Sequence, residues 1–108
     1  MENALEKFIL EVNEKPHLHP LLNNVFLSIL IQSENKKMYL LINDGKLSFS
    51  EKCEKEIDAS IVGASDKLKE VIRGETKLRQ ASNDRSVQIN ARFRTALFLE
   101  SLFYLGYK

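Results

Sequence analysis

Apolar residues near the start of the chain recur at the spacing of one side of an α-helix. Over residues 3–14 they stand at positions i, i+3, i+4 and i+7: Leu5, Phe8, Ile9 and Val12. Charged and amide residues fill the other positions, so the pattern predicts an amphipathic helix. Pro16 and Pro20 then enclose residues 17–19. Because proline restricts the residue before it and lacks an N–H donor, we expect an irregular connection there.

Three strands are predicted next, from short apolar runs separated by turn residues. Val25–Gln32 and Lys37–Asn43 are rich in Ile, Leu and Val, and the polar residues 33–36 separate them. The sequence Asn43-Asp44-Gly45-Lys46 tolerates positive φ and predicts a tight hairpin into a third strand at Leu47–Ser50. Together these signals predict an antiparallel meander.

Alternation gives the first two predicted strands one strongly apolar face. The side chains on that face are Val25, Leu27, Ile29, Ile31, Met38, Leu40 and Ile42. Phe26 and Leu30 share the other face of the first strand with Ser28 and Gln32. One face of the sheet is therefore expected to form an apolar wall.

A fourth strand and a helix are predicted after a charged stretch. Residues 51–56 are too charged for a central strand, whereas Ile57–Gly63 has the pattern of a fourth strand. Ser65 is expected to be the N-cap of a helix that ends at Gly74. The apolar residues of that helix stand at helical spacing: Leu68, Val71 and Ile72.

The last third of the chain predicts a short helix, a strand and a long apolar helix. Thr76 is expected to cap a further turn or two, which Asn83-Asp84 ends, and Ser86–Asn90 alternates as a fifth strand would. The final helix is predicted over Phe93–Tyr104, and apolar side chains cover most of its circumference. The interruptions are Arg94, Glu100 and Ser101.

A helix that buries only one side normally has a broad polar side, and the Phe93–Tyr104 segment lacks one. We therefore expect this helix to contact the core on one side and something apolar on another. The second contact would be a bound lipid, a second copy of the chain or a membrane surface. A short helix sunk in the core is the alternative interpretation.

The order of these elements resembles the sterol carrier protein family. The resemblance runs from about Val25 to Tyr104 and is carried by Asn43-Asp44-Gly45-Lys46-Leu47 and by the segment Ile57–Glu75. It implies an α+β fold with a five-stranded, mainly antiparallel sheet and helices packed on one face. It also implies that residues 1–108 form a single, non-catalytic domain with an apolar tunnel for a fatty acyl chain, a sterol or a similar lipid.

Two turns depart from the pattern of that family. The family commonly has glycine before and just after its last strand, where this chain has Asn83-Asp84-Arg85 and Asn90-Ala91-Arg92. Asn and Asp tolerate left-handed backbone, so the first turn is expected to survive. Ala91 disfavours left-handed backbone, so the sequence does not predict how the chain passes from the last strand into the last helix.

We expect the lipid cavity between the sheet and the last helix. Burying each methylene of a ligand gains about 0.8 kcal/mol, so the cavity needs an apolar wall and a movable apolar lid. The predicted lining residues are Leu27, Ile29, Leu40 and Ile42 as wall, Leu68 and Ile72 as side, and Phe93, Leu97, Phe98, Leu102 and Phe103 as lid. Ordinary core packing would produce the same pattern.

Composition and charge fit one small globular domain. The chain has 108 residues, 44% hydrophobic and 29% charged, with a net charge of +1 that gives no argument for nucleic acid. Residues 67–94 carry eight basic and three acidic residues, or +5, which leaves −4 for the rest. This basic segment is predicted to approach anionic membrane surfaces transiently, unless its charges are spread around solvated helices.

The residue types that support catalysis are sparse. Cys53 is the single cysteine, so no intrachain disulfide forms and a reducing, cytoplasmic setting is expected. Its acidic neighbours would raise the pKa of a thiol nucleophile, and His17 and His19 lack further metal ligands. No phosphate-binding loop or nucleophile elbow is present. We expect no catalytic residues, no metal and no cofactor.

The alternative function is structural. In that interpretation the apolar last helix forms a homodimer, and the protein carries no ligand.

Overall fold

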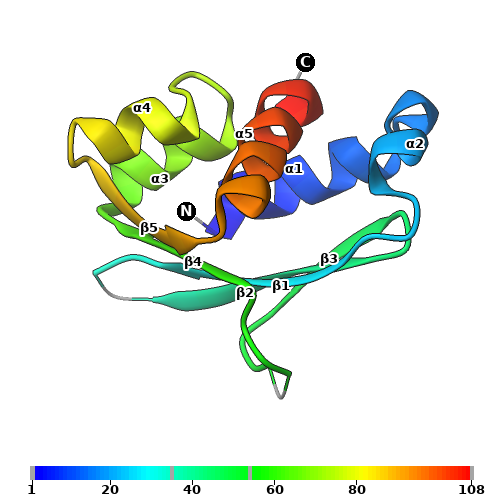
Figure 1. Ribbon diagram of the computed structural model, residues 1–108, viewed down its shortest axis with the longest axis horizontal. Helices are drawn as coiled ribbons and strands as arrows, with labels where there is room; N and C mark the ends of the chain where they lie inside the picture. Colours follow the sequence, from blue (N-terminus) through cyan, green and yellow to red (C-terminus); the bar gives the residue numbers. More distant parts are fainter. Residues whose placement is uncertain (1, 35, 54, 108) are drawn as a thin grey trace.

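The computed structural model describes residues 2–34, 36–53 and 55–107 as a five-stranded sheet with its helices gathered on one face (Figure 1). The helices are α1 (Glu2–Asn13), the 3-10 helix η1 (Pro16–Leu18), α2 (His19–Leu22), α3 (Ser65–Ile72), α4 (Leu78–Asn83) and α5 (Phe93–Tyr107). The strands are β1 (Phe26–Gln32), β2 (Lys37–Asn43), β3 (Lys46–Ser50), β4 (Ala59–Gly63) and β5 (Val87–Ala91). The predicted fold class, α+β with a mostly antiparallel sheet, is confirmed.

The strand order is β3-β2-β1-β4-β5. β1, β2 and β3 form the predicted antiparallel meander, in which Leu27 pairs with Ile42. β4 runs parallel to β1, with Ile29 opposite Ala59, and β5 returns antiparallel to β4. The sheet is therefore mixed, and its one parallel pair lies at its centre.

The β2–β3 hairpin has the predicted turn. Asp44 and Gly45 both have positive φ, 45° and 94°, as a two-residue hairpin with the favoured twist requires. The Asp44 carboxylate also accepts a hydrogen bond from the N–H of Asn24 at 2.9 Å, and its own N–H donates to Val25 O at 2.9 Å. These two bonds connect the hairpin turn to the residues that directly precede β1. The predicted turn at residues 33–36 includes Asn35, which lies outside the described residues.

The expected irregular connection around the two prolines is wrong, because the segment folds as η1 followed by α2. Pro16 is the first residue of η1 and Pro20 the second of α2. At these positions the N–H that proline lacks has no partner within the helix anyway. Leu18 and Leu22 are buried, so tertiary packing stabilises turns too short to persist alone.

The expected helix caps differ from those in the structure. The N-cap of α3 is Ala64, and the N–H of Ser65 donates instead to the Glu34 carboxylate of the β1–β2 turn at 3.1 Å. An anion at this end also interacts favourably with the helix dipole. Thr76 is not the N-cap of α4, since Lys77 occupies that position without a side-chain hydrogen bond.

The predicted stop at Gly74 is confirmed. Gly74 has φ +73°, and its N–H donates to Val71 O while the N–H of Glu75 donates to Glu70 O. These two bonds form a Schellman motif, in which a left-handed residue ends the helix.

Left-handed backbone before β5 falls on Arg85, at φ 66°, and not on Asn83 or Asp84. The Asp84 carboxylate accepts a hydrogen bond from the Ser86 N–H at 2.9 Å. Hydrogen bonds from the Ser86 hydroxyl and N–H lower the pKa of Asp84. The exit of β5 needs no glycine, because α5 begins at Phe93 directly after Arg92.

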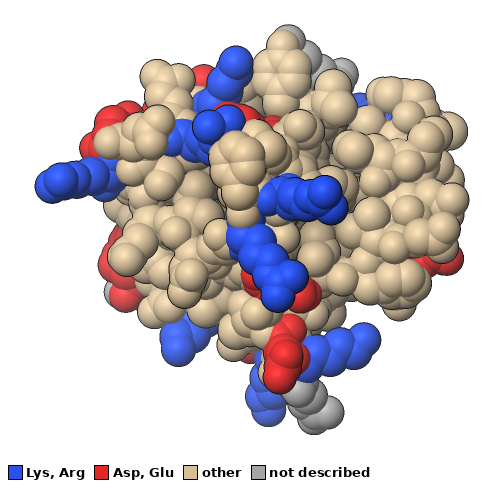
Figure 2. All heavy atoms as spheres, viewed as in Figure 1, with Lys and Arg blue, Asp and Glu red and all other residues tan. Residues whose placement is uncertain are grey.

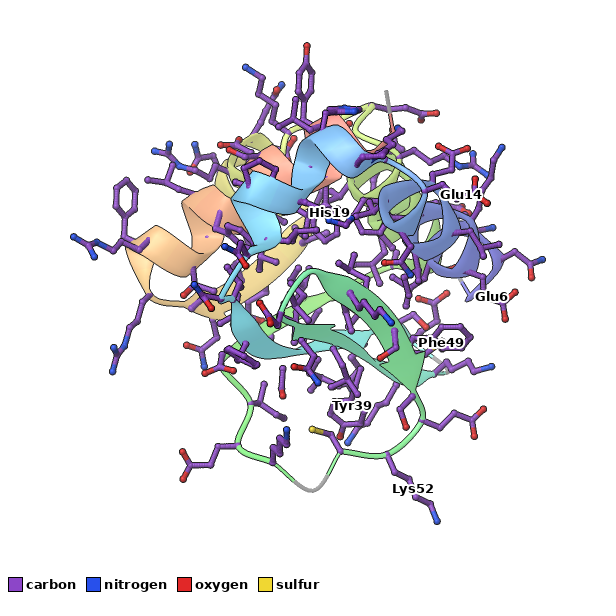
Figure 3. The ribbon with its side chains drawn as sticks, turned by 90° about the vertical axis from the view of Figure 1, so that its right-hand side faces the viewer. Glu6, Glu14, His19, Tyr39, Phe49 and Lys52 are labelled. Atoms are coloured by element: carbon purple, nitrogen blue, oxygen red, sulfur yellow. The ribbon has the colours of Figure 1, made fainter. Side chains whose placement is uncertain are left out.

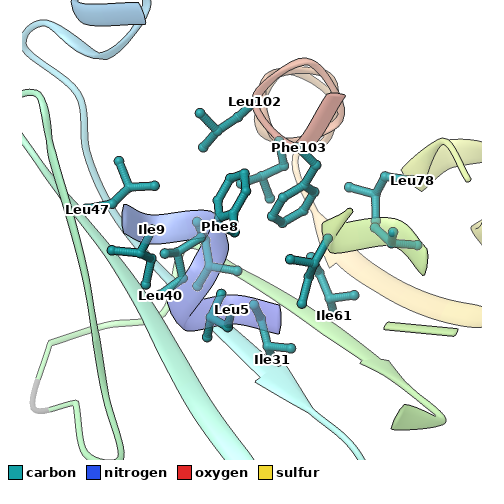
Figure 4. Close-up of a cluster of buried hydrophobic side chains, with 14 of the residues drawn as sticks. Leu5, Phe8, Ile9, Ile31, Leu40, Leu47, Ile61, Leu78, Leu102 and Phe103 are labelled. Carbon is teal, nitrogen blue, oxygen red and sulfur yellow. The ribbon is translucent and has the colours of Figure 1, made fainter. Parts of the chain in front are cut away.

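The core lies between the sheet and the helices, and α1 is at its centre (Figure 4). The Phe8 ring of α1 packs against the Phe103 ring of α5, with centroids 5.2 Å apart. Gly106 near the end of α5 lies so close to α1 that an added Cβ would overlap Phe8 and come within 2.7 Å of Val12. The Lys15 ammonium, just beyond α1, donates to Gly106 O at 2.6 Å.

Gly106→Ala is therefore expected to lower the free energy of unfolding by about 1–3 kcal/mol, because the new methyl group overpacks the α1–α5 contact. Urea denaturation followed by circular dichroism measures the change. Ser101→Ala, on the exposed side of the same helix, is the control and is expected to stay within about 0.5 kcal/mol of the wild type. Equal stability of Gly106→Ala and Ser101→Ala would contradict the close approach.

Candidate functional site

Most of the residues predicted to line a cavity lie together in the core. The buried ones are Ile29, Leu40, Ile42, Leu68, Ile72, Leu102 and Phe103. Leu27 and Phe98 are half-buried and pack against this cluster. Leu97 is half-buried as well. Phe93 stands apart, with 64% of its surface exposed.

The space between the sheet and α5 is occupied by the apolar side of α1. Its buried residues are Ala4, Leu5, Phe8, Ile9 and Val12. Figure 4 shows the Phe8 ring beside the Phe103 ring, and α1 packs against both β3 and α5, so α1 fills much of the space under α5. The helical stripe over residues 3–14 was visible in the sequence, but sequence reasoning gave it no role at the site.

One flank of α5 faces α3 and α4. The guanidinium carbon of Arg79 in α4 lies 5.1 Å from the centroid of the Phe93 ring, a cation–π arrangement. Farther along the same flank, a Cβ on Gly74 would lie 3.3 Å from the Cα of Tyr104. Phe93, Leu97 and Tyr104 share this flank at helical spacing.

The opposite flank of α5 faces α2, which lies on the other side of α5 from α4 (Figure 1). Helical spacing places Phe98 and Leu105 there, and Leu105 is 41% exposed. Half-buried apolar residues of α2 and of the entry of β1 pack against the same core. We call this set the α2–α5 margin: Leu21, Val25, Leu27, Phe98 and Leu105.

The α2–α5 margin borders an uncharged surface. Residues 16–33 contain no Lys, Arg, Asp or Glu. Figure 2 shows a broad surface free of these residues over α2, with the charged groups gathered elsewhere on that face. Insertion of an apolar molecule at the margin would therefore desolvate few charges.

The opposite face of the sheet is more polar. It carries Tyr39, and residues 51–53 and 55–58, which include Lys52, approach it (Figure 3). A groove of about 420 Å³ lies there. Its lining combines the apolar residues Phe26, Leu27, Leu41 and Ile42, of which Leu27 and Ile42 also belong to the predicted cavity wall, with the charged residues Lys52, Lys55, Glu56 and Asp58.

The groups considered for catalysis are dispersed in the structure. His17 and His19 are exposed, and the half-buried Cys53 thiol donates to Lys55 O at 3.5 Å. Within the described residues, no three His, Cys, Asp or Glu side chains are grouped as metal ligands. No helix in that part of the chain is long and apolar enough to cross a membrane.

Sequence comparison gives the family. Residues 3–103 match the SCP-2 sterol transfer family. The chain belongs to this family. The resemblance seen in the order of the sequence motifs is thereby confirmed, and family membership supports lipid binding in general terms. A search of curated protein sequences found no match.

Solved structures show the SCP-2 fold at low sequence identity. A structure described as "UbiJ-SCP2 Ubiquinone synthesis protein" matches with a TM-score of 0.74 and 9% identity, over 90% of this chain and 82% of that one. Apo sterol carrier protein 2 from Yarrowia lipolytica matches at 0.66 and 11%, over 95% and 88%. Sterol carrier protein-2 like-3 from Aedes aegypti matches at 0.64 and 20%, over 94% of each chain.

In this SCP-2 family member the predicted lid residues differ in burial, and stability measurements can separate them. Leu102→Ala is expected to lower the free energy of unfolding by about 2–5 kcal/mol, because it removes a fully buried side chain. Phe93→Ala is expected to cost about 1 kcal/mol or less, since its ring is mostly in solvent and contacts Arg79. Urea unfolding measures both, and a similar loss in the two variants would contradict the described burial.

Proposed function

We propose that this protein binds a single lipid molecule without catalysing a reaction, and that the apolar part of the lipid enters at the α2–α5 margin. Membership of a sterol transfer family supports the ligand class. The observation that carries the location is the second apolar flank of α5, where Phe98 and Leu105 are only partly buried beside an uncharged surface.

Binding at this margin requires α5 to move relative to α1 and the sheet. Leu102 and Phe103 are fully packed in the described core, so an acyl chain must take over their contacts. Each methylene buried contributes about 0.8 kcal/mol, which offsets the contacts that the moving helix loses. A closed core without ligand and an open one with ligand form the pair of states that uptake and release require.

The chemistry of the margin also indicates how the lipid would be oriented. No charged residue occurs between positions 16 and 33, which supply Leu21, Val25 and Leu27 to the margin. An anionic headgroup would find no partner in that segment, and by helical spacing the nearest basic residue on this flank of α5 is the exposed Arg94, one turn before Phe98. The apolar part is therefore placed inside, and a polar headgroup is placed outside in water.

The groove on the opposite face of the sheet is the weaker candidate. Lys52, Lys55, Glu56 and Asp58 line it, so an apolar ligand would desolvate charges of both signs there. The Asp58 carboxylate also accepts a hydrogen bond from the Ser28 N–H at 2.8 Å. Binding an apolar ligand in this groove is therefore less favourable than binding it at the α2–α5 margin.

Lipid binding is tested first on protein purified without detergent. Native mass spectrometry is expected to show one extractable lipid per chain, and a fluorescent sixteen-carbon fatty acid is expected to bind with one-to-one stoichiometry. A sterol and an isoprenoid quinone belong in the competition series, the quinone because one structural neighbour is described as a ubiquinone synthesis protein. A bare chain mass together with no uptake of the fluorescent probe would overturn the proposal.

Two matched phenylalanine variants then locate the site. Phe98→Asp, in the margin, is expected to weaken probe binding about tenfold or more, because it places a charge in the path of an apolar ligand. Phe26→Asp, at an exposed residue of the opposite groove, is expected to leave the affinity unchanged. The reverse result would place the ligand in the opposite groove.

The structural alternative, a homodimer through α5, predicts a different behaviour. Light scattering after size exclusion is expected to give a monomer for the wild type and for Phe98→Asp, since Phe98 and Leu105 offer only a small exposed area. A wild-type dimer that Phe98→Asp converts to a monomer would favour the homodimer over ligand binding.

A further inference from the structure

The two edges of the sheet are treated differently by the rest of the molecule. At the β3 edge, the Asn13 side chain donates from Nδ2 to Leu47 O and accepts from the Leu47 N–H, both at 3.0 Å. Asn13 thus provides the bonds that another strand would make. β5 is the strand at the opposite edge. Unprotected edges are templates for pairing with another extended chain.

The pairing pattern shows which backbone groups of β5 are free. The Asp44 N–H bonds to Val25 O, and the Asp58 N–H to Ser28 O, so odd residues of β1 face β2 and even ones face β4. In the parallel β1–β4 pair, a residue of β1 bonds to the residues before and after its partner, so odd residues of β4 face β1 and even ones face β5. Ser60 and Val62 of β4 pair with Asn90 and Gln88, which therefore face β4. The N–H and C=O groups of Val87, Ile89 and Ala91 point outward, where no described residue is bonded to them.

Two small grooves follow this free edge on the helix side of the sheet. One, of about 320 Å³, is lined by Val87 and Ile89 together with Arg85. The other, of about 260 Å³, is lined by Ile89 and Ala91 together with Arg79 and Phe93. The grooves share Ile89 and are displaced by two residues along β5. This is the repeat at which side chains of one strand return to the same face.

The two grooves have different chemistry. Arg85 has no ion-pair partner among the described residues, which makes its groove suited to a carboxylate. In the second groove Ala91, Phe93 and Ala96 form an apolar part beside Ser82 and Asn83, and the Arg79 guanidinium is stacked on Phe93. Arg85 also holds φ 66°, a conformation that glycine would adopt with less strain.

We propose that the free edge of β5 binds an extended peptide segment of a partner protein as a sixth, antiparallel strand. Backbone bonds to Val87, Ile89 and Ala91 supply affinity, and the two grooves supply specificity. The peptide carries an acidic side chain for Arg85 and, two residues before it, an aromatic one for the Phe93 groove. A second copy of this chain fits less well, because its β5 strand, Val87–Ala91, contains no acidic side chain for Arg85.

The first experiment uses two capped peptides of the same composition. Acetyl-Thr-Thr-Phe-Thr-Glu-Thr-Thr-amide places its two key side chains on one face of a strand, and acetyl-Thr-Thr-Phe-Glu-Thr-Thr-Thr-amide places them on opposite faces. The first peptide is expected to slow amide exchange at Val87, Ile89 and Ala91 in NMR spectra, and to leave Gln88 and Asn90, already bonded to β4, unchanged. Equal effects of the two peptides would overturn the proposal.

A pair of arginine variants tests the charge contact. Arg85→Gly is expected to weaken binding of the first peptide about tenfold without lowering the melting temperature, because glycine relieves the left-handed backbone. Arg73→Ala removes a charge from the same basic segment at the end of α3, and is expected to leave the affinity unchanged. Wild-type affinity in Arg85→Gly would contradict the contact.

The occupant is tested separately by measuring amide exchange at rising protein concentration without peptide. Exchange at Val87, Ile89 and Ala91 is expected to be independent of concentration. Protection that grows with protein concentration would assign the edge to a second copy and overturn the peptide proposal.

Discussion

The contact between α1 and α5 sets the arrangement of the helical layer. Gly106 allows the two helices to approach, Phe8 and Phe103 fill the space beneath, and the Lys15 ammonium bonds to the last turn of α5. Because Phe103 and Gly106 must face α1, this contact also determines how α5 is rotated about its own axis. Leu99, Leu102 and Phe103 turn inward, Phe93 and Tyr104 turn toward α3 and α4, and Phe98 and Leu105 turn toward α2. The α2–α5 margin is thus a consequence of how α5 packs on α1.

Local signals in the sequence were sufficient for most of the fold. The hairpin at Asp44-Gly45 and the helix end at Gly74 were predictable because the requirement for positive φ and the residues that meet it lie in the same few positions. The strands were predictable from their apolar alternation, and the family from the order of the motifs. In each case the residues that determine the turn, helix end or strand lie within a few positions of it in the sequence.

The features that sequence reasoning missed have causes that lie elsewhere in the chain. Ser65 is not a cap because Glu34, which stands 31 residues before it, supplies the acceptor. η1 and α2 form in a proline-rich segment because Leu18 and Leu22 are buried in the core. The prediction of a wall and a lid overlooked α1 because periodicity shows that a helix has a buried side, but not which elements that side separates. Phe93 has the pattern of a core residue and is mostly exposed, because it lies at the turn where β5 leads into α5.

The bond between Lys15 and Gly106 joins residues 91 positions apart, and this separation has a consequence for folding. Contacts between distant parts of a chain are slow to form, because a long loop must close first. Phe8 gains its aromatic partner Phe103 only when this long loop of the chain has closed. The apolar side of α1 that α5 covers is therefore expected to be among the last surfaces buried during folding.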